Sequence, residues 1–117
     1  MTGEPPDEIR LRDHGHSLEL DYGTSEKYAL SAEYLRVESP SAEVKGHGPG
    51  QEITVAGKKN VRILRLEPVG HYALRIVFDD RHDTGLYTWD YLRELGRDEN
   101  KRWPAYLQKL GEQKLTR

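Results

Sequence analysis

Cysteine is absent from the 117 residues of this chain. The chain alone therefore cannot form a disulfide, use a catalytic thiol, or hold zinc or an iron–sulfur cluster through cysteines. Long apolar runs are also missing, since no stretch approaches the roughly 20 residues that a transmembrane helix needs. The opening residues MTGEPPDEIR are acidic and contain two prolines, unlike a secretory signal peptide. These absences lead us to expect a cytoplasmic protein.

The chain also lacks an excess of charge of one sign. Its 18 basic and 20 acidic side chains are mixed along the sequence and give a net charge of −2. Such a balance provides no global attraction to nucleic acid or to an anionic membrane. Hydrophobic residues make up 35% of the chain, which at this length is enough for one domain with a small core.

Short segments with a period of two predict β-strands. IRLRD and HSLELDYG alternate apolar and polar residues, as strands with one solvated face do. Residues 61–69 and 72–78 form the best candidate strand pair. Arg62, Arg65 and Arg75 could form a small basic stripe on this pair. No aromatic residues alternate with them, so a solvated face of mixed charge is favoured over a nucleic-acid surface.

Helices are predicted where capping residues precede apolar residues at helical spacing. Ser31 is a candidate N-cap for AEYLRVE, and Thr88 or a neighbour for WDYLRELG, which Gly96 should end. A separate last helix should start near Asn100, with Pro104 in its first turn. The predicted fold class is α+β: an antiparallel β-sheet with a few short helices packed on one face, a two-layer sandwich. We expect a disordered tail over residues 1–8, a single domain over 9–112 and a frayed tail over 113–117.

The segment Ser39–Gln51, SPSAEVKGHGPGQ, combines three glycines with a lone histidine. Its spacing matches neither phosphate-binding glycine motif, and no helix start follows that could direct amides at a phosphate. A loop whose glycines adopt positive φ is the stronger interpretation. Such a loop can still carry binding residues when a rigid scaffold supports it.

Metal binding and catalysis find little support in the motifs. His47, His82, Asp80 and Asp83 are weak candidate metal ligands, because FDDRHDTG is equally well explained as a tight turn. No helical histidine pair or calcium-binding loop is present. The serines lie in turn or cap contexts and form no nucleophile elbow. The sequence therefore predicts a protein that is not an enzyme.

Three blocks carry a resemblance to a known family. LSAEYLRVESPSAEVKGHGPGQ, LEPVGHYALRIVFDDRHDTGLYTWDYLREL and the closing W-x2-YL resemble the gamma-butyrobetaine hydroxylase-like N-terminal domain, over residues 9–110. One branch of that family consists of small bacterial proteins of unknown function. In larger relatives the domain precedes an iron- and 2-oxoglutarate-dependent dioxygenase domain. The chain is also similar to a domain appended to some P-loop ATPases of iron–sulfur cluster assembly.

The resemblance implies a difference at one metal site. The hydroxylases hold zinc in this domain through three cysteines and a histidine, and their segment RDNCPCSDC matches RVESPSAEV here. Ser39, Ser41 and Val44 stand at the cysteine positions, so no zinc is expected there. His82 lies close to the position of the histidine. The catalytic iron ligands belong to the other domain, so oxygenase activity is not implied.

We therefore expect a non-enzymatic accessory or binding module with a protein partner, and neither a nucleic-acid nor a membrane partner. An iron–sulfur assembly protein or an iron-dependent oxygenase system is the candidate partner. The alternatives are a metal-binding protein that uses His and Asp ligands for iron or zinc, and a small hydrolase or transferase with an unrecognised site. No other cofactor is expected. The candidate binding surface consists of Tyr34, Arg36, Lys45, His47 and Gln51.

Overall fold

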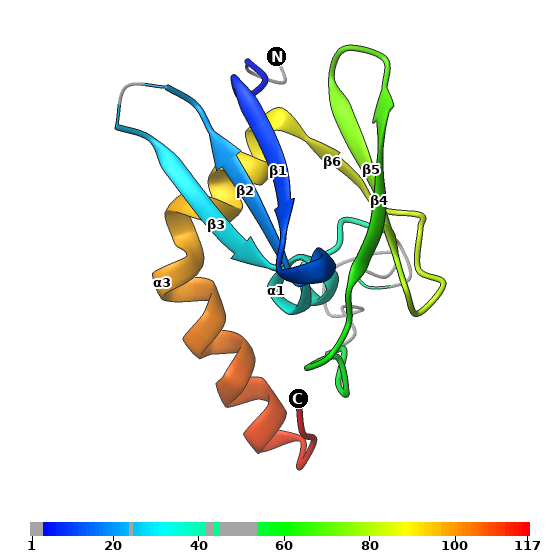
Figure 1. Ribbon diagram of the computed structural model, residues 1–117. Coiled ribbons are helices and arrows are strands. Elements are labelled where there is room, and N and C mark those ends of the chain that lie inside the picture. The colour runs from blue at the N-terminus through cyan, green and yellow to red at the C-terminus, as the bar shows by residue number, and fades with distance from the viewer. Residues whose placement is uncertain (1–3, 24, 42–43, 45–53) are drawn as a thin grey trace.

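The computed structural model describes residues 4–23, 25–41, 44 and 54–117 (Figure 1). Within them the chain alternates short strands with two α-helices and one 3₁₀ turn. In chain order these are β1 (Glu8–Arg12), η1 (Asp13–Gly15), β2 (Ser17–Asp21), β3 (Lys27–Ser31), α1 (Ala32–Val37), β4 (Ile63–Val69), β5 (Ala73–Phe78), β6 (Leu86–Thr88) and α3 (Trp89–Glu112). This order of elements confirms the α+β class.

The first three strands form one antiparallel sheet in the order β1-β2-β3. Leu18 of β2 pairs with Leu11 and Leu30, and the alternate residues of β2 face solvent. The turn η1 joins β1 to β2 through Gly15, whose φ is +92°. A Cβ on this glycine would lie 2.3 Å from the carbonyl oxygen of Ile63. Glycine is therefore required where the first sheet touches the start of β4.

The last three strands form a second antiparallel sheet in the order β4-β5-β6. Leu66 pairs with Ile76, and a register shift between Ile63 and Arg65 bends the start of β4. The described strands thus make two small sheets where the sequence predicts one. The alternation of apolar residues identifies each strand, but it does not say which strands pair.

Helix α3 is one helix of 24 residues, so the predicted break between two helices is wrong. Thr88 caps its start by accepting the N–H of Tyr91 at 3.1 Å. Gly96 lies inside the helix. The ring of Tyr28 packs against this position, and a Cβ there would come within 2.5 Å of that ring. Pro104 is also internal and exposed. It removes one backbone donor without ending the helix.

Helix α3 passes behind the first sheet and continues beyond it toward the C-terminus (Figure 1). Its first half contributes Trp89, Leu92 and Leu95 to the main core between the sheets and the helix. Its second half contributes Tyr106 and Leu110, which pack with Val37 in a smaller cluster. None of the described helices has the length and apolar character needed to cross a bilayer.

Asp7 and the last residues of the chain contact the folded body. The N–H of Asp7 donates to the carbonyl of Asp21 at 2.7 Å, so pairing with β2 begins before the first strand. In the segment 113–117, expected to be a frayed tail, Arg117 forms two hydrogen bonds with Glu33 at 2.8 and 3.0 Å. The carbonyl of Thr116 accepts the N–H of Gly57. The last residues are therefore held against α1 and the segment before β4.

Candidate binding surface

Helix α1 sets the position of Arg36. Ser31 caps the helix by accepting the N–H of Tyr34 at 3.0 Å, as its sequence context predicts. The buried face of the helix holds Leu35 in the main core. Arg36, in the last turn, reaches the turn that follows β5, and its side chain is 11% exposed.

Asp80 lies at the centre of this contact. Its Oδ2 accepts from Arg36 Nε at 2.8 Å and from Lys58 Nζ at 2.6 Å. Its Oδ1 accepts the backbone N–H of His82 at 3.1 Å. Burial opposes ionisation, but the hydrogen bonds from Lys58 and Arg36 outweigh it and lower the pKa of Asp80 to about 2. The carboxylate therefore joins α1, the segment before β4 and the turn after β5.

A second contact joins the residues after α1 to the same turn. Ser39 and His82 are buried, and Ser39 Oγ lies 2.8 Å from His82 Nε2. Ser41 Oγ lies 2.7 Å from Thr84 Oγ1. Gly85 permits this close approach, since a Cβ there would meet Ser39 Oγ at 2.5 Å. The Ser–His pair is thus enclosed in the packing between two chain segments.

The positions that correspond to the zinc ligands of the hydroxylases lie at this same contact. Ser39, Ser41 and His82 lie next to one another. Val44 is joined to Ser41 because its N–H donates to the carbonyl of Ser41 at 2.9 Å. Three positions that hold cysteine in the hydroxylases here carry two neutral hydroxyls and a valine. These groups lack the charge and softness of the thiolates that bind structural zinc. The residues present do not fit that ion.

The weak metal candidates make other contacts. His82 bonds Ser39, Asp80 bonds two cations, and Asp83 lies 3.8 Å from Arg75. His47 lies outside the described residues. Among the residues that are described, no three His, Asp or Glu side chains converge as a metal site requires.

The predicted surface residues fall into three groups. Arg36 is largely covered, and its guanidinium bonds Asp80. Tyr34 is fully buried, and its hydroxyl donates to the carbonyl of Leu95 at 2.7 Å, so it contributes to the core and not to a surface. Lys45, His47 and Gln51 lie outside the described residues. Sequence reasoning misses Lys58, because nothing in the local sequence AGKKN distinguishes it from its neighbour.

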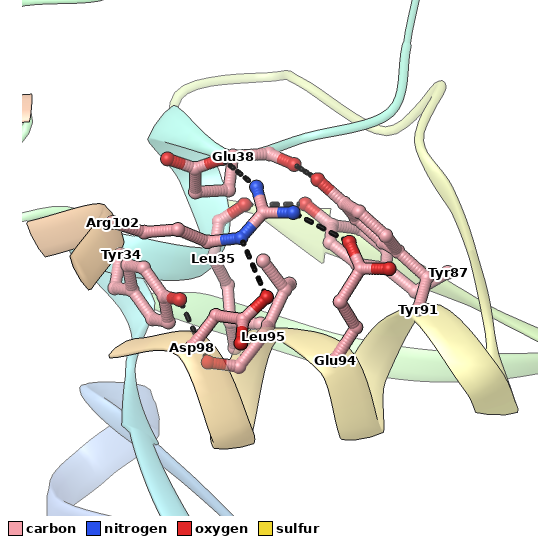
Figure 2. A network of polar contacts seen from close by, with 9 residues as sticks. All are labelled: Tyr34, Leu35, Glu38, Tyr87, Tyr91, Glu94, Leu95, Asp98 and Arg102. Atoms are coloured by element: carbon pink, nitrogen blue, oxygen red, sulfur yellow. Dashed lines mark hydrogen bonds and ion pairs between the residues drawn. The ribbon is translucent and has the colours of Figure 1, made fainter. Parts of the chain in front are cut away.

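A polar network fixes the end of α1 against α3 (Figure 2). Arg102 donates to Glu38 at 2.8 Å and also bonds Glu94, while Asp98 lies at 4.0 Å. The hydroxyls of Tyr87 and Tyr91 donate to the carbonyls of Leu35 and Glu38. Burial raises the pKa of both tyrosines, so the hydroxyls stay protonated as donors. These contacts therefore join the last turn of α1, which carries Arg36, to β6 and α3.

A hollow of about 510 Å³ lies between the second half of α3 and the end of α1. Its charged lining comes from Glu38, Arg102, Lys109 and Glu112. The Ser39–His82 pair is not part of that lining, so the hollow and the pair do not combine into one reaction site.

Comparison with known proteins agrees with this architecture. A family model described as gamma-butyrobetaine hydroxylase-like, N-terminal, matches residues 9–93. Two NMR solution structures resemble the chain with TM-scores of 0.84 and 0.82 at 46% and 42% identity. They cover 97% and 98% of this chain and 90% and 86% of their own.

A crystal structure of a protein of unknown function from Acidithiobacillus ferrooxidans, assigned to the DUF971 family, is also similar. It has a TM-score of 0.63 at 38% identity and covers 78% of this chain and 91% of its own. No curated protein matches the sequence.

Proposed function

Because the chain belongs to the gamma-butyrobetaine hydroxylase-like N-terminal family, we propose that it is a binding module for a partner protein and catalyses no reaction itself. The family description names an N-terminal portion of hydroxylase-like proteins, which is a part that accompanies another domain. This supports an accessory role, and fold-level analogy alone supports the choice of partner.

One observation carries the proposal. The described side chains best suited to chemistry, Ser39, His82 and Asp80, are all used to hold the turn 79–85 in place. Ser39 is 0% and His82 4% exposed, so a substrate could not reach the pair in this conformation. A nucleophile and its base need an open position beside them for the reacting atom.

The partner we propose belongs to an iron–sulfur assembly system or to an iron-dependent oxygenase system. The experiment mixes the ¹⁵N-labelled chain with one purified protein of each class from the same genome and records amide shifts. We expect one of them to shift signals from Arg36, Lys58 and the turn 79–85. A stoichiometric complex that leaves these signals unchanged would contradict the proposed surface, and no complex with either class would contradict the proposed partner.

Metal analysis separates this proposal from the metal-binding alternative. The untagged chain is purified, exposed to Fe(II) or Zn(II), desalted and measured by elemental analysis. An accessory module should retain far less than one ion per chain. Retention of one iron or zinc ion per chain, lost on His82→Ala substitution, would favour the metal-binding alternative.

A further inference from the structure

We infer that the surface around Asp80 binds an acidic segment of the partner protein, an inference that rests on the proposed function. We call this region the basic surface. It comprises the cationic residues Arg36, Lys58, Lys59, Arg62 and Arg81, together with the carboxylates of Asp79 and Asp80.

Hydrogen bonds and ion pairs place these residues side by side. Lys58 and Arg36 both bond Asp80. Asp79 accepts the backbone N–H of Arg62 at 3.0 Å and donates its own N–H to the carbonyl of Arg62 at 2.9 Å. The segment 58–62 therefore lies against the turn 79–81, and Lys59, Arg62 and Arg81 are exposed on it.

The charge of this region opposes that of the whole chain. Five cations face two carboxylates on the basic surface, whereas the chain has a net charge of −2. Removing these residues from the chain's 18 basic and 20 acidic side chains leaves 13 basic and 18 acidic. Asp83, in the same turn, is near Arg75, which Glu67 also contacts. With Arg75, Glu67 and Asp83 included, six cations face four carboxylates, so a local excess of positive charge remains.

Arg36 and Lys58 carry positive charge that Asp80 alone does not fully neutralise. Both donate to the same oxygen of Asp80, so one carboxylate serves two cations. Arg36 Nη1 is buried and has no hydrogen-bond partner among the residues that the structure describes. An uncompensated cation that is partly withdrawn from water destabilises the fold. Carboxylates brought by a partner would offset that charge and would be attracted from a distance.

The same surface is poorly suited to single-stranded nucleic acid. Sequence-independent binding of single strands needs aromatic rings on which bases stack, in addition to cations. Phe78 and Tyr87, the aromatic residues of the adjoining strands, are buried with 1% and 0% exposure. A flexible acidic peptide needs charge complementarity alone, which this surface supplies.

The test uses a capped hexaglutamate peptide and the full-length ¹⁵N-labelled chain at low salt. We expect binding that shifts signals of the basic surface and weakens as salt is added. Lys59→Glu should weaken binding about fivefold, since it reverses one exposed charge. Lys101→Glu is the matched control: it makes the same charge change on an exposed position of α3 and should leave affinity within about twofold.

Equal weakening by both variants, or no binding at low salt, would overturn the inference. So would tighter binding of a ten-nucleotide single-stranded DNA than of the peptide. The partner found in the shift experiment provides a separate arm. If that partner binds the Lys59→Glu and Arg81→Asn variants as tightly as the unchanged chain, the acidic-segment inference fails while the proposed function stands.

Discussion

Asp80 shows how a single carboxylate can organise a surface. Two cations and a backbone N–H converge on it from three parts of the chain. Arg36 and Lys58 come from segments distant from Asp80 in sequence, and together with the N–H of His82 they hold the turn 79–85. The Asp80 side chain is 19% exposed, so water screens these contacts only in part.

Asp80→Asn should lower the free energy of unfolding by about 1–2 kcal/mol at pH 7. The pKa of Asp80 is lowered in the folded state, so the native protein binds fewer protons than the unfolded chain between its ordinary pKa and about 2. The stability from Asp80 is complete above pH 4 and is lost as the pH falls toward 2. Urea denaturation followed by circular dichroism at several pH values measures both effects.

Asp83→Asn is the control for that measurement. The Asp83 side chain is 44% exposed and lies 3.8 Å from Arg75, so its loss should change stability by less than about 0.5 kcal/mol. If the two variants were equally stable, or if Asp80→Asn kept the full acid dependence of the unchanged chain below pH 4, the role given to Asp80 would be wrong.

The residues of the candidate surface could be predicted from the sequence only where the signal is local. The Ser31 cap places α1, and with it Arg36, because a cap and a helical period are local features. Ser39 and His82 are 43 positions apart, and their contact depends on how the second sheet packs on α1. The burial of Tyr34 escapes sequence reasoning because a helix of six residues gives too few positions to fix its buried face.

At the scale of elements, α3 shows why glycine and proline can mislead. Both residues weaken an isolated helix, and the sequence therefore predicts a break between Gly96 and Pro104. In the folded chain the packing of Trp89, Leu92 and Leu95 on one half and Tyr106 and Leu110 on the other outweighs these local penalties. Tertiary packing therefore decides the length of this helix.

Gly96→Ala should lower the free energy of unfolding by about 1–3 kcal/mol, although alanine is the better helix former. The added Cβ would lie 2.5 Å from the ring of Tyr28, which would have to move. Gly111→Ala in the same helix is the matched control, because nothing lies within 4 Å of its Cβ position. It should raise stability by up to about 1 kcal/mol.

Thermal unfolding followed by circular dichroism distinguishes the expected destabilisation by Gly96→Ala from the expected stabilisation by Gly111→Ala. In a Tyr28→Ala background, Gly96→Ala should lose most of its destabilising effect, because the ring that the added methyl group meets is gone. A stabilising effect of Gly96→Ala in the unchanged background would show that the close approach to Tyr28 is not required.

At the scale of the whole molecule, the C-terminal residues link the two apolar clusters. Glu33 is 5% exposed and accepts both hydrogen bonds from Arg117. The guanidinium of Arg117 also lies 5.4 Å from the ring centre of Trp103. Trp103 packs against both the main core and the smaller cluster. The tail is therefore part of the folded domain's packing.

Arg117→Ala should lower the free energy of unfolding, because it leaves the buried carboxylate of Glu33 without its cation. A double-mutant cycle with Glu33→Gln provides the control. In the Glu33→Gln background the same arginine substitution should cost less than in the unchanged chain. Equal losses in both backgrounds, measured by urea denaturation, would show that the ion pair contributes nothing.

The placement of the two tryptophans allows their fluorescence to test whether the domain unfolds cooperatively. Trp89 emits from the main core, where its indole N–H donates to the carbonyl of His71 at 2.9 Å, and Trp103 emits from the junction of the two clusters. The fluorescence of each, isolated by replacing the other with phenylalanine, follows a different part of the fold. Coincident transitions would identify a single folding unit, and an earlier change at Trp103 would identify the C-terminal half of α3 as a separately melting segment.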